Sequence, residues 1–184
     1  MVFPEKTYDF ITGKGAFLET MISYFPKEEK SIQNYIDLVD QVSKKSLSYY
    51  ANKAIPGLLG SLAYPFMSKP FLKYAALSTK EVLTGLGCST ELIGVLTGQW
   101  GDYGLPPNQS SFGVQAMVAR PYREGGNYPV GGSRMIEETI IPGIQSRGGK
   151  VVLSTGVKEI LTHKSKAVGV LVENGDENET KVGE

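Results

Sequence analysis

The sequence contains few of the residues that carry out chemistry without a cofactor. Its 184 residues include one Cys, Cys88, and one His, His163, and basic and acidic residues are equal in number at 19 each. A single Cys excludes an intramolecular disulfide and a Cys-rich zinc site. A nucleic-acid-binding protein needs a basic excess to neutralise phosphates, and this chain has none. We therefore expect neither a metal centre nor a nucleic-acid partner.

Long apolar segments are also missing. No run of about 18 uncharged apolar residues occurs, which excludes a conventional membrane-spanning helix. The first residues show no basic segment followed by an apolar stretch, so no secretory signal is predicted. We expect a protein that is not secreted and is either cytoplasmic or peripherally attached to a membrane. Residues 54–67 come nearest to an apolar run, and we interpret them as a buried loop with a short helix. The alternative is a surface that dips into a membrane.

The first half of the chain has a helical pattern. Only 4 of the 22 Gly residues in the whole chain precede residue 85. Apolar residues recur near the helical period over residues 27–52, which predicts a long helix with Leu47 and Tyr50 on its apolar face. Shorter helices are predicted at residues 15–24, 71–76, 79–86, 91–97 and 112–119, with a loop at 98–109.

The second half is rich in turns. A helix is predicted over residues 133–146, with Pro142 inside it and Gly148 and Gly149 after it. Strands are predicted at residues 8–11, 150–154, 157–162 and 166–172. A turn begins at residues 174–176, after which we expect the chain to stop without a partner strand, as a hairpin cut at its turn. The predicted fold class is α+β (mixed α/β): mostly helical with a short sheet segment.

A search for catalytic groups gives no candidate. Gly13 and Gly15 lack the third Gly of a dinucleotide-binding loop, and no Walker A sequence occurs. His163 is interpreted as a solvated residue at a strand end, and Cys88 as a buried, inert thiol. The catalytic residues therefore remain unknown.

Aromatic residues in glycine-rich loops are the remaining candidates for a site. Such a set packs in a core or an interface, or it lines a pocket for a large apolar ligand. Arg120 and Arg123 could pair with a carboxylate or phosphate of a ligand, although surface ion pairs are the simpler interpretation. The candidate pocket residues are Trp100, Tyr103, Phe112, Tyr122 and Tyr128.

The order of motifs in the second half resembles the middle of a flavoprotein. The segments that carry the resemblance are residues 128–133 (YPVGGS), 147–151 (RGGKV), 157–160 (VKEI) and 167–170 (AVGV), and the opening segments FP at 3–4, TYDF at 7–10 and YFP at 24–26 add to it. Together they resemble the FAD-dependent phytoene desaturase, carotenoid isomerase and all-trans-retinol 13,14-reductase family of the amine-oxidase superfamily. The resemblance covers nearly the whole chain.

The resemblance implies a division into two regions. Residues 1–130 would be mainly helical substrate-domain material, and residues 131–184 would return to a discontinuous, here incomplete, FAD-binding domain. Val157 stands where the family holds the adenine of FAD through a strand's backbone. The family's N-terminal Gly-rich loop is absent, so we expect this chain to be an internal fragment that does not hold FAD and is inactive alone.

The resemblance also implies a function for the parent protein. We expect an FAD-dependent oxidoreductase or isomerase that acts on an apolar polyene, in which the flavin performs the redox chemistry. One alternative is an amine-oxidase-like flavoprotein with a polar substrate. Another is a non-enzymatic helical module that binds an apolar ligand or a partner protein. Peripheral membrane contact of the parent is left open, and exposed interdomain surfaces near residues 151–172 are expected to promote self-association.

Overall fold

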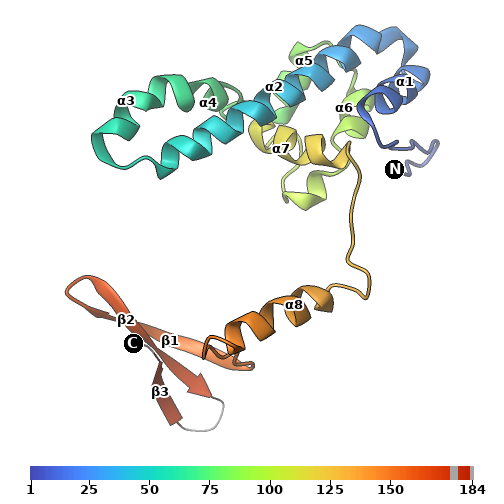
Figure 1. Cartoon of the computed structure of the whole chain (residues 1–184). Helices are drawn as coiled ribbons and strands as arrows, with labels where there is room; N and C mark the ends of the chain where they lie inside the picture. Colours follow the sequence, from blue (N-terminus) through green and yellow to red (C-terminus); the bar gives the residue numbers. More distant parts are fainter. Residues whose placement is uncertain (175–177, 183–184) are drawn as a thin grey trace. The chain divides into compact units, whose positions relative to one another are not determined.

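The computed structural model describes residues 1–174 and 178–182, with side chains up to residue 173. These residues form two compact units, residues 1–126 and the residues from 127 onward (Figure 1). The first unit is helical and the second combines one helix with a sheet, so the α+β class predicted from the sequence is confirmed. No helix in this described part is both long and apolar enough to cross a membrane.

The first unit is built around the long helix α2 (Glu29–Ala54). Its N-terminal half buries an apolar face that includes Ile32, Ile36 and Val39. Helices α1 (Lys14–Tyr24), α3 (Gly57–Met67), α4 (Lys69–Ala75) and α7 (Phe112–Tyr122) pack against α2 (Figure 1). The unit is completed by η1 (Pro26–Glu28), α5 (Thr79–Gly85), α6 (Thr90–Leu96) and η2 (Trp100–Asp102).

Side-chain caps fix the starts of three of the short helices. The Ser78 hydroxyl accepts a hydrogen bond from the Glu81 backbone N–H, and the Glu81 carboxylate accepts one from the Ser78 N–H. This reciprocal capping box satisfies two amide donors that a helix start leaves free. Ser89 and Ser111 cap α6 and α7 in the simpler one-sided way. The helices predicted at these three places are therefore present.

The apolar face predicted for the long helix is correct as far as Val42 and wrong beyond it. Leu47 is 68% exposed and Tyr50 is 54% exposed, whereas Ser43 and Ser46 are buried. The buried stripe continues through these two serines, whose small side chains leave room for the neighbouring helices. The positions of the apolar residues alone therefore do not indicate the buried side of the helix in this segment.

Two other expectations for the first unit are also corrected. Residues 54–67 are not a buried loop with a short helix: they include the eleven-residue helix α3, none of whose residues is buried. Residues 8–11 do not form a strand. Just before them, an isolated β-bridge joins Val2 and Thr7. Tyr8 instead packs its ring against Phe3, Tyr24 and Phe25.

The second unit contains α8 (Arg134–Gln145) and an antiparallel sheet in the order β1-β2-β3. The strands are β1 (Thr155–His163), β2 (Lys166–Asn174) and β3 (Asn178–Val182). The predicted helix and the predicted strands at 157–162 and 166–172 are therefore present. Helix α8 continues past Pro142.

Two predictions for the second unit are wrong. Residues 150–154 form no strand, because they have no neighbouring strand to pair with in the described part of the chain. The expectation that the chain ends without a partner strand also fails, because β3 pairs with β2. The turn predicted at residues 174–176 lies mostly outside the described residues.

The contrast between the two halves of α2 gives a stability test. Ile36→Ala creates a cavity in the core and should lower the free energy of unfolding by about 2–5 kcal/mol. Leu47→Ala removes an exposed side chain of the same helix and should change it by less than about 0.5 kcal/mol. Urea unfolding followed by the fluorescence of Trp100, the only Trp, reports on this unit. Equal effects of the two substitutions would contradict the assignment of the buried face.

Candidate functional site

The candidate site is a cavity of about 290 Å³ in the first unit. Its volume is close to the lower end of the range for small-molecule sites, about 300–1,000 Å³. Aromatic and aliphatic side chains form one part of its wall, and polar groups form the other. The apolar residues are Phe10, Ile11, Phe17, Leu96 and Ala119, and the polar ones are Thr12, Tyr35, Gln99, Tyr122 and Arg123.

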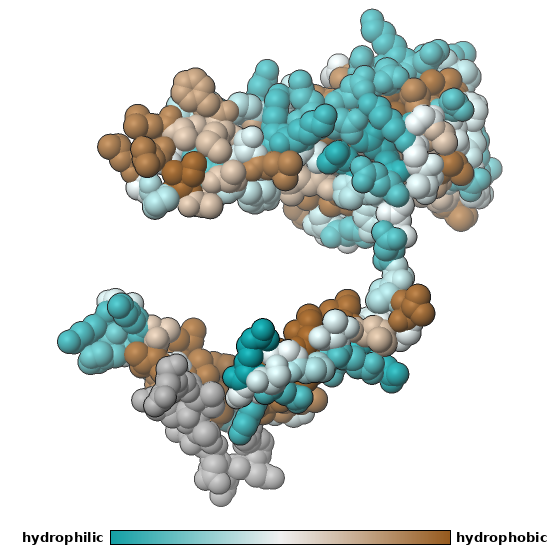
Figure 2. Space-filling view, viewed as in Figure 1, coloured by the Kyte–Doolittle hydropathy of each residue, from teal (hydrophilic) through white to brown (hydrophobic). Residues whose placement is uncertain are grey.

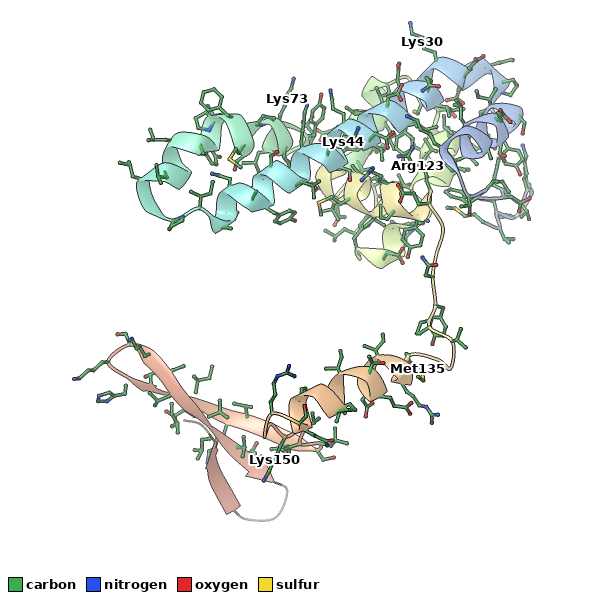
Figure 3. All side chains as sticks on the ribbon, viewed as in Figure 1. Lys30, Lys44, Lys73, Arg123, Met135 and Lys150 are labelled. Carbon is green, nitrogen blue, oxygen red and sulfur yellow. The ribbon has the colours of Figure 1, made fainter. Side chains whose placement is uncertain are left out.

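An ion pair between a buried arginine and a partly buried aspartate lies beside this cavity. Arg123 caps the C-terminus of α7, is 8% exposed, and donates a hydrogen bond through Nη2 to Oδ1 of Asp40 on α2 (Figure 3). Lys14 of α1 reaches the other carboxylate oxygen of Asp40 at 2.8 Å. The backbone also joins these elements, because the N–H of Gly13 donates to the Arg123 carbonyl at 2.7 Å. The ion pair therefore connects α1, α2 and α7 beside the cavity.

The charge of Asp40 is stabilised at this place. Partial burial favours the neutral acid, but hydrogen bonds from Lys14 and Arg123 outweigh it, so the pKa of Asp40 lies below its ordinary value. Nε and Nη1 of Arg123 are buried without a hydrogen-bond partner in the structure. Asp40 is therefore the group that compensates the buried guanidinium.

A hydrogen-bonded network of polar side chains crosses the core next to the cavity. Gln115 of α7 is 1% exposed, and its Nε2 donates to the Tyr35 hydroxyl and to the Leu96 carbonyl, each at 3.1 Å. Tyr103 donates a hydrogen bond to Oε1 of the same amide. Burial raises the pKa of Tyr35 to about 12, so this phenol stays neutral near pH 7. The network therefore places a neutral hydroxyl group in the cavity wall.

The structure brings two of the five candidate aromatic residues to this region. Tyr122 lines the cavity directly, and a hydrogen bond with Asp102 of η2 raises the pKa of its hydroxyl. Tyr103 lies behind the wall, where it contacts Gln115. Trp100 is 45% exposed on η2, and Phe112 is fully buried in the core.

The other candidates lie in the second unit. Tyr128 is 76% exposed, and its hydroxyl accepts a hydrogen bond from the Ser133 N–H at 3.2 Å. Val157 is 61% exposed on β1 and pairs with Val172 of β2. His163 is exposed at the end of β1.

The cavity wall and the polar groups beside it include residues that the sequence did not single out. Tyr35 appeared only as one member of a helical apolar pattern, and neither Gln115 nor Asp40 was considered. Arg123 was considered as half of a surface ion pair, but its guanidinium is buried. One available signal was the polar side chain of Gln115 within the helix predicted at residues 112–119. Among the described residues, no group of three His, Cys, Asp or Glu side chains could hold a metal ion. Cys88 is buried, which raises the pKa of its thiol to about 11.

Comparison with known proteins supports the resemblance that the order of the motifs indicated. The chain is similar in sequence to members of the desaturase, isomerase and retinol-reductase family that its motifs indicated. It is 37% identical over 177 residues to the human all-trans-retinol 13,14-reductase, a match that covers 94% of this chain.

Two further relatives match the same segment. A zebrafish (Danio rerio) protein named inactive all-trans-retinol 13,14-reductase is 29% identical over 94% of this chain. The chloroplastic prolycopene isomerase of carrot (Daucus carota) is 26% identical over 82% of it. The chain spans 29% of each retinol reductase and 22% of the isomerase. No family model matches the chain, and no solved structure matches it.

The Asp40 ion pair predicts an acid-dependent loss of stability. A carboxylate whose pKa is lowered by folding stabilises the fold above its unfolded-state pKa of about 4. That stabilisation is lost as the pH falls through the lower folded-state pKa. Asp40→Asn should therefore lower the free energy of unfolding at pH 7 by about 1.5–3 kcal/mol and reduce its decline in acid.

The matched control is Asp37→Asn. Asp37 lies on the same helix and contacts the same Lys14 at 3.0 Å, but its side chain is 58% exposed. This exposed pair should contribute no more than about 1 kcal/mol. Urea unfolding at a series of pH values measures both variants. If Asp40→Asn lowers the free energy of unfolding no more than Asp37→Asn does, the stabilising role given to the Asp40–Arg123 pair is contradicted.

Proposed function

We propose that this chain is part of an FAD-dependent oxidoreductase or isomerase that acts on an apolar polyene of the retinoid or carotenoid class. The observation that carries the proposal is the 37% identity to a retinol 13,14-reductase over 94% of the chain. The chain spans less than a third of that relative, so the activity is assigned to the parent protein. The match to prolycopene isomerase extends the substrate class to carotenoids.

The first unit would contribute to the substrate site. The cavity supports this role because a polyene requires apolar walls, and Phe10, Phe17 and Leu96 provide them. Tyr122 would contact the ligand directly, and Tyr103 would position the wall through Gln115. Trp100 and Phe112 of this unit and Tyr128 of the second unit do not line the cavity, so their part in substrate binding stays a prediction from the sequence. The chain's own contribution would be to bind the substrate and to exclude water.

The second unit would contribute to the flavin site. β1 lies at the edge of the sheet, so one side of this strand has no partner strand among the described residues. Its exposed segment at Val157 fits the proposed backbone contact with the adenine of FAD. When bound, FAD would accept or donate the electrons of the reaction. The chain has no phosphate-binding loop, so the rest of the cofactor would be held by other segments of the parent.

Uncovered apolar side chains in the second unit support its assignment to a larger domain. Ile136, Ile140 and Ile144 recur every four residues along α8, and they are 58%, 55% and 37% exposed. Such a stripe on one side of a helix normally packs against another element. We propose that the remainder of the FAD-binding domain covers it in the parent, and that the isolated chain self-associates through it. The parent would be cytoplasmic or peripherally attached to a membrane.

The parent protein provides the test of this function. Purified parent should show flavin absorbance, and after reduction of its flavin it should convert all-trans-retinol or a carotenoid to a saturated or isomerised product detected by chromatography. The isolated chain should bind no FAD. The control is the parent with its flavin removed, which should not react.

Other outcomes would overturn the proposal. A parent without flavin that binds a retinoid tightly would be a non-enzymatic binding module. A parent with flavin that oxidises amines and leaves polyenes unchanged would be an amine-oxidase-like enzyme. Because one matching relative is named as inactive, the product measurement is needed in addition to the flavin spectrum.

A further inference from the structure

Helix α3 presents an apolar surface to solvent. Leu58, Leu59, Leu62 and Phe66 are 76%, 69%, 63% and 82% exposed. At 3.6 residues per turn, these four positions lie within an arc of about 100° on one side of the helix. No charged residue occurs between Lys53 and Lys69. Figure 2 shows the resulting hydrophobic area at the α3 end of the first unit.

Hydrogen bonds on another side of α3 hold the helix in this orientation. The buried side chain of Asn52, near the end of α2, donates to the Gly60 carbonyl at 2.9 Å. It also accepts a hydrogen bond from the Ser68 hydroxyl at 2.7 Å. A Cβ atom at Gly60 would lie 2.5 Å from the Ile55 carbonyl oxygen, so the close approach requires Gly at this position. The exposure of the apolar arc is therefore built into the fold.

The charges around α3 are of one sign. Between Asp40 and Glu81 the sequence has six lysines and no acidic residue, although the whole chain has equal numbers of both. Lys53 precedes α3, and Lys69 and Lys73 follow it. Figure 3 labels Lys44 and Lys73, which belong to α2 and α4, the two helices that pack against α3. No salt bridge forms with these lysines in the described part of the chain.

We propose that α3 docks on the surface of an anionic lipid bilayer, with Leu58, Leu62 and Phe66 inserted among the lipid chains. An interfacial helix combines a buried apolar face with basic residues that contact the headgroups. Long lysine side chains can reach those headgroups while their stems stay in apolar surroundings. Eleven residues are too few to span a bilayer, so the helix lies in the interface.

The charge pattern favours a bilayer over a second copy of this chain. Two α3 surfaces packed together would bring two lysine-rich, acid-free segments close to each other, and like charges in contact repel. An anionic membrane instead presents negative charge to these lysines. The inference depends on the apolar side chains of α3 and on the lysines that flank this helix, and it stands independently of the reaction proposed for the parent.

Vesicle flotation of the 184-residue chain tests this inference. The chain should float with vesicles of phosphatidylcholine and phosphatidylserine, and less with phosphatidylcholine alone. Leu58→Ser/Phe66→Ser should lower the bound fraction about tenfold, because the apolar insertion is lost. Lys53→Gln/Lys69→Gln/Lys73→Gln should remove the preference for phosphatidylserine. All replaced side chains of the first variant are exposed, and circular dichroism checks that it folds.

The matched control is Ile136→Ser/Ile140→Ser, which removes two exposed apolar side chains from α8 in the second unit. It should float like the unchanged chain. Absence of flotation by the unchanged chain, or undiminished flotation of Leu58→Ser/Phe66→Ser, would overturn the inference. So would a dimer in light scattering that only the α3 variant dissociates. These outcomes are separate from the flavin and product measurements, so either proposal can fail alone.

Discussion

The ion pair between Arg123 and Asp40 is the interaction on which the organisation of the first unit depends. A guanidinium that is nearly excluded from water is costly unless a carboxylate compensates it. Here the carboxylate lies on α2, the arginine ends α7, and Lys14 of α1 completes the charge cluster. These three helices also contribute Phe17, Tyr35 and Tyr122 to the cavity wall, so the interaction that joins them helps to set the position of that wall.

Much of the fold could be predicted because local rules determine it. Ser78 and Glu81 form a capping box that is legible in the sequence, and the apolar period of α2 over Ile32, Ile36 and Val39 is regular. The prediction failed where tertiary contacts decide. Ser43 and Ser46 are buried because neighbouring helices approach there, and Tyr8 lies among aromatic rings that come from residues distant in the sequence.

The candidate site was less predictable than the fold for the same reason. Its polar residues come from α2, from α7 and from the loops that precede α1 and follow α6, and their pairing depends on how these elements pack. Tyr122 was predicted as one of several aromatic residues in glycine-rich loops, whereas Asp40 has no local signal of function and Gln115 has only its polarity within a predicted helix. The family, in contrast, was recognised from the order of short motifs, and the 37% identity to a retinol reductase supports that recognition.

The central claim of this account is that the second unit is one part of a larger flavin-binding domain. Hydrogen–deuterium exchange of the isolated chain and of the same residues in the flavin-loaded parent tests it most directly. The account predicts that amides of α8 and β1 exchange at least about tenfold more slowly in the parent, because the rest of that domain covers them, while those of α2 change little. Equal exchange of α8 and β1 in both proteins would contradict it.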